Sequence, residues 1–268
     1  MKFTKQIFLY FFATLIFVSC SQYEKVLKGD DYDKKYEMAE KLYLKGKFLK
    51  AVPLFEEVIS IYSKLSEKGE KAYYYLCYSH YNMQEYALAG YYFRNFQITY
   101  PQSEHAEEAS FMGAMCKVAA SPKSSLDQTN TLTAINELQS FLNRYPKTER
   151  KDTCNQIIDN MRGKLEQKAF ESSKLYYHME DYEAAAVSFT NMLSDYPDTE
   201  LREEVLYLVV KSNYKLAANS VKEKKVERFE ETIKSYTKFV DNFPSSKKLK
   251  ELESFYTNAQ QEIKNSQK

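Results

Sequence analysis

One pattern of side chains recurs five times along this chain of 268 residues and restricts its fold more than any other feature. Each copy starts at a bulky or branched residue, has a small residue three positions later, a large residue four positions after that, and an aromatic residue seven positions further on. The copies start at Phe48, Tyr86, Thr131, Tyr182 and Phe229. Offsets of three and four lie on one face of an α-helix. The pattern therefore predicts five helices that each bury one face.

The small residue of each copy would let another helix approach closely, and the large residue one turn later would fill the adjoining groove. The small residues are Ala51, Ala89, Ala134, Ala185 and Thr232, and the large ones are Phe55, Phe93, Leu138, Phe189 and Tyr236. Proline follows the terminal aromatic in four copies, at Pro101, Pro146, Pro197 and Pro244. Because proline lacks an N–H and disfavours helix in the preceding residue, each helix should end there.

A first helix is expected before each of these five, separated from it by a short polar turn such as 45–47 or 179–181. Ala39, Cys77 and Ser173 lie twelve residues before the small residue of the second helix. That spacing, with proline twelve residues after the same small residue, resembles the tetratricopeptide repeat. The resemblance implies an all-α, right-handed α-solenoid, here with five helix pairs and a C-terminal capping helix over roughly 247–264. We expect no strand.

The repeats are unevenly spaced, since successive copies start 38, 45, 51 and 47 residues apart, whereas the plain tetratricopeptide family repeats every 34 or so. We expect the excess in two loops, 121–127 and 220–225, and in extra helix over 153–168.

The N-terminus has the pattern of an export signal. Lys2 and Lys5 precede an apolar run over 7–18 that stops at Ser19-Cys20, and the residues after it are polar and charged. The run is shorter than the roughly 20 residues of a spanning helix, so we interpret it as a cleaved signal peptide. The small residue before Cys20 resembles the bacterial lipobox, which implies lipidation of Cys20. An ordinary secretory signal with a chance cysteine is the alternative.

These features divide the chain into a lipoprotein signal peptide (1–19), a lipidated tether (20–32), N-terminal tetratricopeptide repeats (33–120), and C-terminal repeats with the capping helix (121–268). Removing residues 1–19 takes two lysines from the 38 basic residues and none of the 37 acidic ones, which leaves 36 − 37 = −1. A charge this small favours neither nucleic acid nor anionic lipid as a partner.

No set of residues predicts catalysis or a cofactor. His80, His105 and His178 lie in three different repeats without further metal ligands at a suitable spacing, and no glycine-rich phosphate motif is present. Three cysteines remain after Cys20, namely Cys77, Cys116 and Cys154. We interpret them as buried thiols, with a single reversible disulfide as the alternative. The chain is predicted not to be an enzyme and to bind no metal.

Tyrosine is unusually frequent, with 24 residues and no tryptophan, and many lie in the first two repeats. Helix packing alone would explain them, because a tyrosine ring fills an interface while its hydroxyl keeps a polar partner. In tetratricopeptide geometry, however, first-helix residues line the inner surface. That resemblance implies a partner-binding groove formed by Tyr36, Glu40, Tyr43, Tyr74, Tyr78 and Tyr81. Both interpretations stay open from the sequence, and a groove of this kind would suit an extended peptide or a helix.

The start of the mature chain narrows the resemblance. It contains Cys20-Ser21-x-Tyr23-x-Lys25-Val26-Leu27-Lys28, then Asp31-Tyr32-Asp33-x-Lys35-Tyr36, followed by Ala39, Tyr43 and Phe48-x-x-Ala51. With four further pairs, this resembles the BamD family of the outer-membrane β-barrel assembly machinery. The resemblance implies a scaffold on the periplasmic face of the outer membrane, attached to the bilayer through acylated Cys20 only. Its implied partners are unfolded outer-membrane proteins at the N-terminal repeats and the insertase's periplasmic domains at the C-terminal repeats, with no nucleic acid.

Two other classes of protein share some of these features. A generic periplasmic tetratricopeptide adaptor lipoprotein in envelope biogenesis would have the same repeats and a different partner. A glycan-binding lipoprotein of the nutrient-uptake type also uses such helices, but the absence of tryptophan removes the usual side chain for stacking on a sugar. Identification of crosslinked partners in membranes would separate these alternatives.

Overall fold

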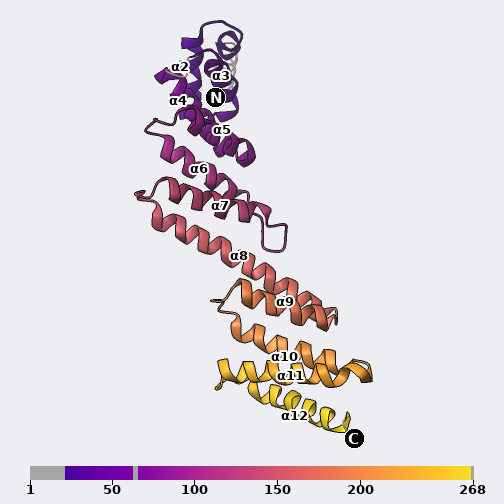
Figure 1. Cartoon of the computed structure of the whole chain (residues 1–268). Coiled ribbons are helices and arrows are strands. Elements are labelled where there is room, and N and C mark those ends of the chain that lie inside the picture. Colours follow the sequence, from indigo (N-terminus) through magenta and orange to yellow (C-terminus); the bar gives the residue numbers. More distant parts are fainter. Residues whose placement is uncertain (1–21, 63–65, 267–268) are drawn as a thin grey trace, which may run out of the picture. The chain divides into compact units, whose positions relative to one another are not determined.

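The computed structural model describes residues 22–62 and 66–266, and within these ranges every regular element is a helix (Figure 1). The predicted signal peptide and Cys20 lie outside the described residues. A helical stretch at 22–27 comes first. The first helices of the pairs are α2 (Tyr32–Leu44), α4 (Glu67–Asn82), α6 (Ala106–Ala119), α8 (Lys151–His178) and α10 (Arg202–Ala218). The second helices are α3 (Phe48–Ile61), α5 (Tyr86–Thr99), α7 (Thr129–Arg144), α9 (Tyr182–Asp195) and α11 (Lys222–Asn242), and α12 (Leu249–Ser266) follows them.

The chain forms two compact units, and α8 contributes to both. The N-terminal unit contains the residues up to 122 together with 128–161, and the C-terminal unit contains 123–127 and 162–268. In the N-terminal unit each helix from α2 to α7 packs on the next, and α2 also contacts α4. In the C-terminal unit α9 to α12 do the same, and α10 also contacts α12. Five helix pairs and a final helix packed in sequence confirm the all-α, tetratricopeptide-like prediction, while the right-handed course of the stack stays a prediction.

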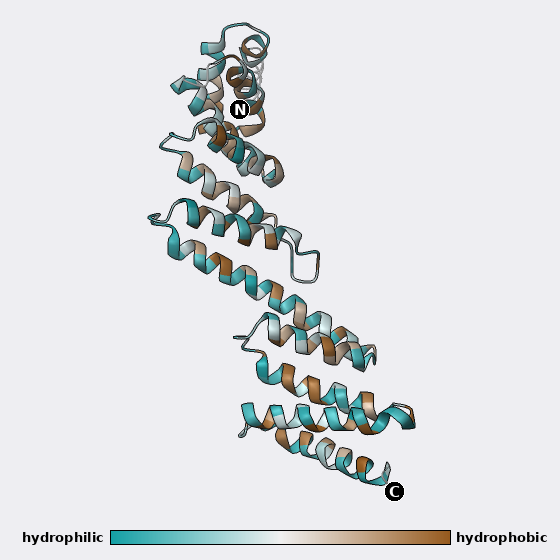
Figure 2. Cartoon of the chain, in the orientation of Figure 1, coloured by the Kyte–Doolittle hydropathy of each residue, from teal (hydrophilic) through white to brown (hydrophobic). Residues whose placement is uncertain are grey.

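The repeated pattern places its small residues at close contacts between helices. Ala51, Ala89, Ala134, Ala185 and Thr232 have no exposed surface. Four of the five large residues are also fully buried: Phe55, Phe93, Leu138 and Phe189. Figure 2 shows hydrophobic and hydrophilic residues alternating along the helices, as expected where one face is buried.

Tyr236 departs from the predicted pattern, because it is only partly buried and stacks on Tyr256 of α12 with ring centroids 4.7 Å apart. Phe239, nearly one turn later, is fully buried. A phenolic hydroxyl needs a polar neighbour whereas a phenyl ring does not, which favours phenylalanine at the inner position. The position ten residues after each start is in fact buried in all five second helices, at Val58, Phe96, Phe141, Met192 and Phe239.

Two of the predicted insertions need correction. Residues 222–225 are not a loop but the first turn of α11, since lysine and glutamate are good helix formers and no proline or glycine interrupts them. The extra helix expected at 153–168 exists, but it is continuous with the first helix of the fourth pair and gives the 28-residue α8. The loop predicted at 121–127 is confirmed between α6 and α7, and α12 confirms the capping helix.

All five second helices end on the predicted aromatic residue, which is the C-cap in each case: Tyr62, Tyr100, Tyr145, Tyr196 and Phe243. In the four copies that contain proline, a turn then leads to the next helix, over 101–105, 146–150, 197–201 and 244–248. These turns all have the same length.

A serine or threonine two residues after the proline ties each of these turns to the first helix of the preceding pair. Ser103 Oγ donates to Glu70 Oε1 at 2.6 Å and accepts from the His105 N–H at 2.9 Å. The same arrangement joins Thr148 to Glu107, Thr199 to Glu166 and Ser246 to Glu203, again with an N–H two residues on. We call these four arrangements the hydroxyl clasps; they join residues 33 to 43 positions apart and could not be predicted from spacing within a helix.

Replacing Thr148 with valine should lower the free energy of unfolding by about 1–2 kcal/mol. The variant keeps the shape of the side chain but leaves Glu107 without its donor and the Arg150 N–H without its acceptor. Urea denaturation followed by circular dichroism measures the change. Thr133→Val is the control, because the Thr133 hydroxyl bonds only to the Thr129 carbonyl of its own helix. Equal stabilities for the two variants would contradict a stabilising role for the clasp.

Candidate partner-binding groove on the N-terminal unit

The six residues predicted to line a groove come from two helices that contact each other. Tyr36, Glu40 and Tyr43 lie on α2, and Tyr74, Tyr78 and Tyr81 lie on α4. In both helices the spacing is four and then three residues, which places each set on one helical face. The structure therefore brings the predicted residues onto two adjacent first helices.

The α2 set is anchored to α4 by one ion pair and one ring stack. Lys71 Nζ lies 2.9 Å from Glu40 Oε1, and the Tyr36 hydroxyl donates to the same oxygen at 3.4 Å. The Tyr43 ring stacks on Tyr75 at a centroid distance of 4.3 Å. Glu40 and Tyr43 are partly buried, so one side of each remains open to solvent.

A residue that lines a groove should be at least partly exposed, and for Tyr36 this expectation is wrong, since only 7% of it is accessible. Its ring packs in the cluster that contains Phe55 and Leu76, and Lys68 covers it with Nζ 5.9 Å from the ring centroid. Tyr36 therefore supports the α2–α4 contact, and only its hydroxyl is directed to the polar residues of the groove.

The α4 set connects α4 to α6. The rings of Tyr74 and Tyr78 meet edge to face at 5.0 Å, and Tyr74 also stacks on His105 at 4.2 Å. The Tyr78 hydroxyl donates to Glu108 Oε1 at 2.7 Å. Arg150 Nη2 lies 3.7 Å from the other oxygen of Glu108. These tyrosines are partly buried, so they contribute both to packing and to the surface.

Two aromatics expected in the core lie instead at the edge of this surface. Phe55 and Phe93 are fully buried as predicted, but Phe48 and Tyr86 are only partly buried. Each of the latter is the first residue of its helix, where neighbours cover one side only. Phe48 meets Tyr43 edge-on at 5.6 Å and Tyr86 meets Tyr81 at 5.5 Å. Four further residues of this surface could not be predicted from the sequence, because their contacts join different helices: Lys71, Tyr75, His105 and Glu108.

The tyrosine hydroxyls of the groove stay protonated at neutral pH. Burial raises the pKa of Tyr43 to about 12. Burial likewise raises the pKa of Tyr74, Tyr78 and Tyr81, and at Tyr78 the hydrogen bond to Glu108 adds to the effect. The hydrogen bond to Glu40 raises the pKa of Lys71 and keeps it charged. The residues of the predicted groove therefore present neutral hydroxyl donors, aromatic rings and one lysine–glutamate pair.

Stability should fall steeply above about pH 10, where tyrosines of the unfolded chain lose their protons. The folded chain keeps those protons longer, since burial raises the pKa of Tyr43, Tyr73 and Tyr78. The unfolded state then binds fewer protons than the folded state, so the free energy of unfolding decreases with pH in this window. Thermal melts between pH 8 and pH 12 would test this, since a constant midpoint across the window would contradict it. Tyrosinate absorbance should appear together with unfolding.

The described residues form no metal site, and their cysteines are buried. They contain no cluster of three or more histidine, cysteine or carboxylate side chains that could hold a metal ion. Cys77, Cys116 and Cys154 are buried and unpaired, which confirms their predicted burial. Burial raises the pKa of the Cys77 and Cys116 thiols, so both are held protonated.

Two solved structures align loosely with this chain. The tetratricopeptide domain of P58(IPK) aligns over 91% of this chain and 69% of its own, at 11% identity and a TM-score of 0.41. The yeast histone chaperone Hif1 aligns over 89% of this chain and 95% of its own, at 14% identity and a TM-score of 0.28. Both likenesses are loose, so the description of the fold rests on the helix pairs themselves.

Sequence comparison is more specific. A putative outer membrane protein assembly factor BamD from Aquifex aeolicus (strain VF5) is 25% identical over 240 residues, which cover 89% of this chain and 78% of that protein. Among the described residues no helix is both long enough and apolar enough to cross a bilayer. The model of the family named YfiO, described as an outer membrane lipoprotein, matches residues 29–229, from the start of the repeats into α11. The chain belongs to this family of outer membrane lipoproteins.

Proposed function

We propose that this protein is a lipid-anchored scaffold of the outer-membrane β-barrel assembly machinery. The observation that carries the proposal is the family match over residues 29–229, which includes helices of both units. The similarity to an assembly factor named BamD supports the same role. In this proposal acylated Cys20 holds the chain to the periplasmic face of the outer membrane, and the helix pairs bind other proteins without catalysing a reaction.

The N-terminal unit would receive unfolded outer-membrane proteins. Its groove combines exposed edges of Tyr43, Tyr74, Tyr78 and Tyr81 with hydrogen-bonding hydroxyls. Aromatic side chains with a polar end suit a partner segment that alternates apolar and polar residues, as a β-strand of a barrel does. The C-terminal unit would then bind the periplasmic domains of the insertase.

Crosslinking in intact membranes tests the proposed assembly. A photoreactive residue in place of Glu253, which is exposed on α12, should capture the insertase if the C-terminal unit binds it. A photoreactive residue in place of Tyr81 should capture outer-membrane barrel precursors. Capture of envelope proteins unrelated to barrel assembly at both positions would instead support a generic adaptor.

Replacing both Tyr74 and Tyr78 with alanine should weaken binding of a barrel-derived peptide by about 1–3 kcal/mol, the usual loss for aromatic hot spots. The double variant also loses packing against His105 and Phe93. Tyr73→Ala is therefore the matched control: Tyr73 lies on the same helix and packs on Phe96 and Tyr100, outside the predicted groove. Peptide affinity is measured at a temperature where all variants are folded. Equal affinity in the double variant and the control would contradict a role of the groove.

A further inference from the structure

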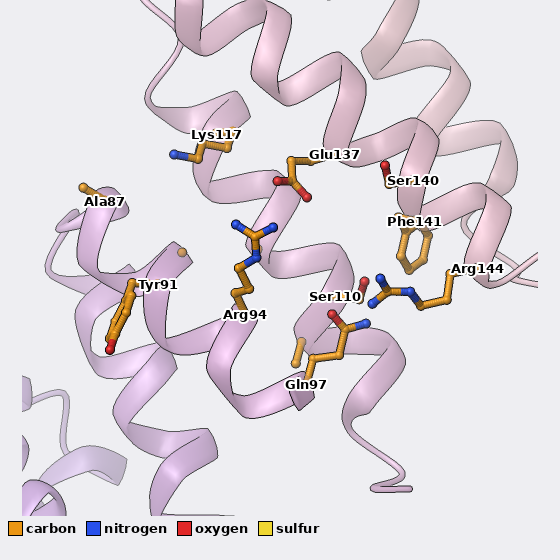
Figure 3. A pocket seen from close by; sticks show the side chains of 13 residues that line it. Ala87, Tyr91, Arg94, Gln97, Ser110, Lys117, Glu137, Ser140, Phe141 and Arg144 are labelled. Atoms are coloured by element: carbon orange, nitrogen blue, oxygen red, sulfur yellow. The ribbon is translucent and has the colours of Figure 1, made fainter. Parts of the chain in front are cut away.

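A second surface of the N-terminal unit forms a cleft that none of the predicted groove residues enters. It has a volume of about 270 Å³ and lies across α5, α6 and α7. Its walls are Tyr91, Arg94 and Gln97 on one side and Glu137 and Arg144 on the other, with Lys117 at one end. Figure 3 shows Arg94 and Arg144 extending into the cleft from different helices.

The cleft concentrates positive charge that the rest of the protein does not neutralise. Arg94, Lys117 and Arg144 face one carboxylate, Glu137, so the lining has a net charge of 3 − 1 = +2. None of these three cations forms an ion pair with another described residue. By contrast, Arg150 pairs with Glu108 and Arg228 with Glu183. The guanidinium groups of Arg94 and Arg144 therefore both line the cleft without an ion-pair partner.

The floor of the cleft is built from small residues at a close helix contact. A Cβ atom added at Gly90 would lie 3.3 Å from Cβ of Cys116, and one added at Gly113 would lie 3.8 Å from Cβ of Phe93. Ala109 and Ser110 continue the floor. The two glycines therefore let α5 and α6 pack closely beneath the cleft, between the two arginines.

The cleft and the tyrosine groove lie on opposite faces of α6. Glu108 binds Tyr78 of the groove, whereas Lys117 lines the cleft. The two residues are nine positions apart (117 − 108), which turns a helix by about 900°, or about two and a half turns. A ligand in the cleft would therefore not compete with one on the tyrosines.

We propose that this cleft binds an acidic segment of a partner protein, with its carboxylates on Arg94 and Arg144. A guanidinium group can bind a carboxylate through two parallel hydrogen bonds, which makes arginine the side chain suited to such a ligand. Tyr91, 60% exposed at the edge of the cleft, offers an apolar surface beside the charges. Exposed tyrosine next to arginine is typical of protein–protein interfaces. The hydroxyls of Ser110 and Ser140 and the amide of Gln97 can bond to a peptide backbone.

The test uses the lipidated protein purified in detergent and a fluorescent peptide that repeats Glu-Leu-Phe four times and is amidated at its C-terminus. The double variant Arg94→Gln, Arg144→Gln should bind this peptide at least tenfold more weakly than the unaltered protein. A peptide with glutamine in place of glutamate should bind the unaltered protein with a similar loss. Because both arginines are exposed and unpaired, the melting temperature should not change.

Arg162→Gln is the control. Arg162 is exposed on α8 outside the cleft, and its replacement removes the same type of charge. An equal loss in this control, or no loss in the double variant, would overturn the proposal. So would failure of the acidic peptide to bind the unaltered protein. Binding to phosphatidylglycerol vesicles that depends on both arginines, without peptide binding, would assign the cleft to lipid instead. Tyr74 and Tyr78 are unaltered throughout, so the result is independent of the function proposed for the groove.

Discussion

A Cys20→Ser variant is expected to lose its acyl chains and to leave the outer-membrane fraction almost completely. In the proposed function the acyl chains are attached through the cysteine thiol, which serine lacks. Each buried CH₂ contributes about 0.8 kcal/mol to membrane attachment, and two or more chains make that attachment stable. Removing all of them therefore removes the proposed anchor in a single substitution.

Labelling with radioactive palmitate and fractionation of the envelope measure the two consequences separately. The variant should carry no label and should be recovered either as an unprocessed form or in the periplasm. Ser21→Ala, next to the same cysteine, should keep the label. Sedimentation of unlabelled Cys20→Ser protein with the outer membrane after a high-salt wash would show that the anchor is not the lipid.

Phe93→Ala should lower the free energy of unfolding by about 3–5 kcal/mol, the usual cost of removing a large buried ring. Phe93 has no exposed surface and meets Tyr78 edge-on at 5.1 Å. It packs in the cluster that joins α4, α5 and α6. Because each helix pair is stabilised mainly by its neighbours, a cavity here should loosen the adjoining pairs as well.

Urea denaturation of Phe93→Ala and Tyr91→Ala provides the comparison. Tyr91 lies on the same helix two residues away and is 60% exposed, so its removal should change the stability by about 0.5 kcal/mol or less. A loss for Phe93→Ala of the same small size would show that the helix faces have been assigned in the wrong register.

The second helices could be predicted from the sequence because their pattern is local. A small residue and a large residue one turn apart define a buried face whatever the partner helix is, and Ala89 with Phe93 is an example. The end of four of these helices is equally local, since the aromatic C-cap precedes a proline. The continuity of α8 was harder to predict because a single glycine, Gly163, is its only candidate for a break, and one glycine is tolerated in a helix.

The candidate site depended on contacts between distant residues, and there the sequence was less informative. Tyr36 is buried because Lys68 and Leu76 of another helix cover it, which no spacing within α2 reveals. The cationic cleft was missed for the same reason, since Arg94 and Arg144 are 50 positions apart in the sequence (144 − 94) and meet only through α6. The sequence offered only two glycines in helices, Gly90 and Gly113, as a signal. A glycine in a helix indicates a close contact only once the approaching helix is known.

The hydroxyl clasps explain how repeats of unequal length can share one architecture. The turns that carry them keep a constant length, whereas within the pairs the connection varies from 83–85 to 120–128 and the first helix extends to the 28 residues of α8. Residues inserted at 120–128 would therefore leave the contact between Thr148 and Glu107 intact. Related proteins could therefore differ in the length of the connections within the pairs, and so in the surface that these connections form. The turns between successive pairs would keep their geometry.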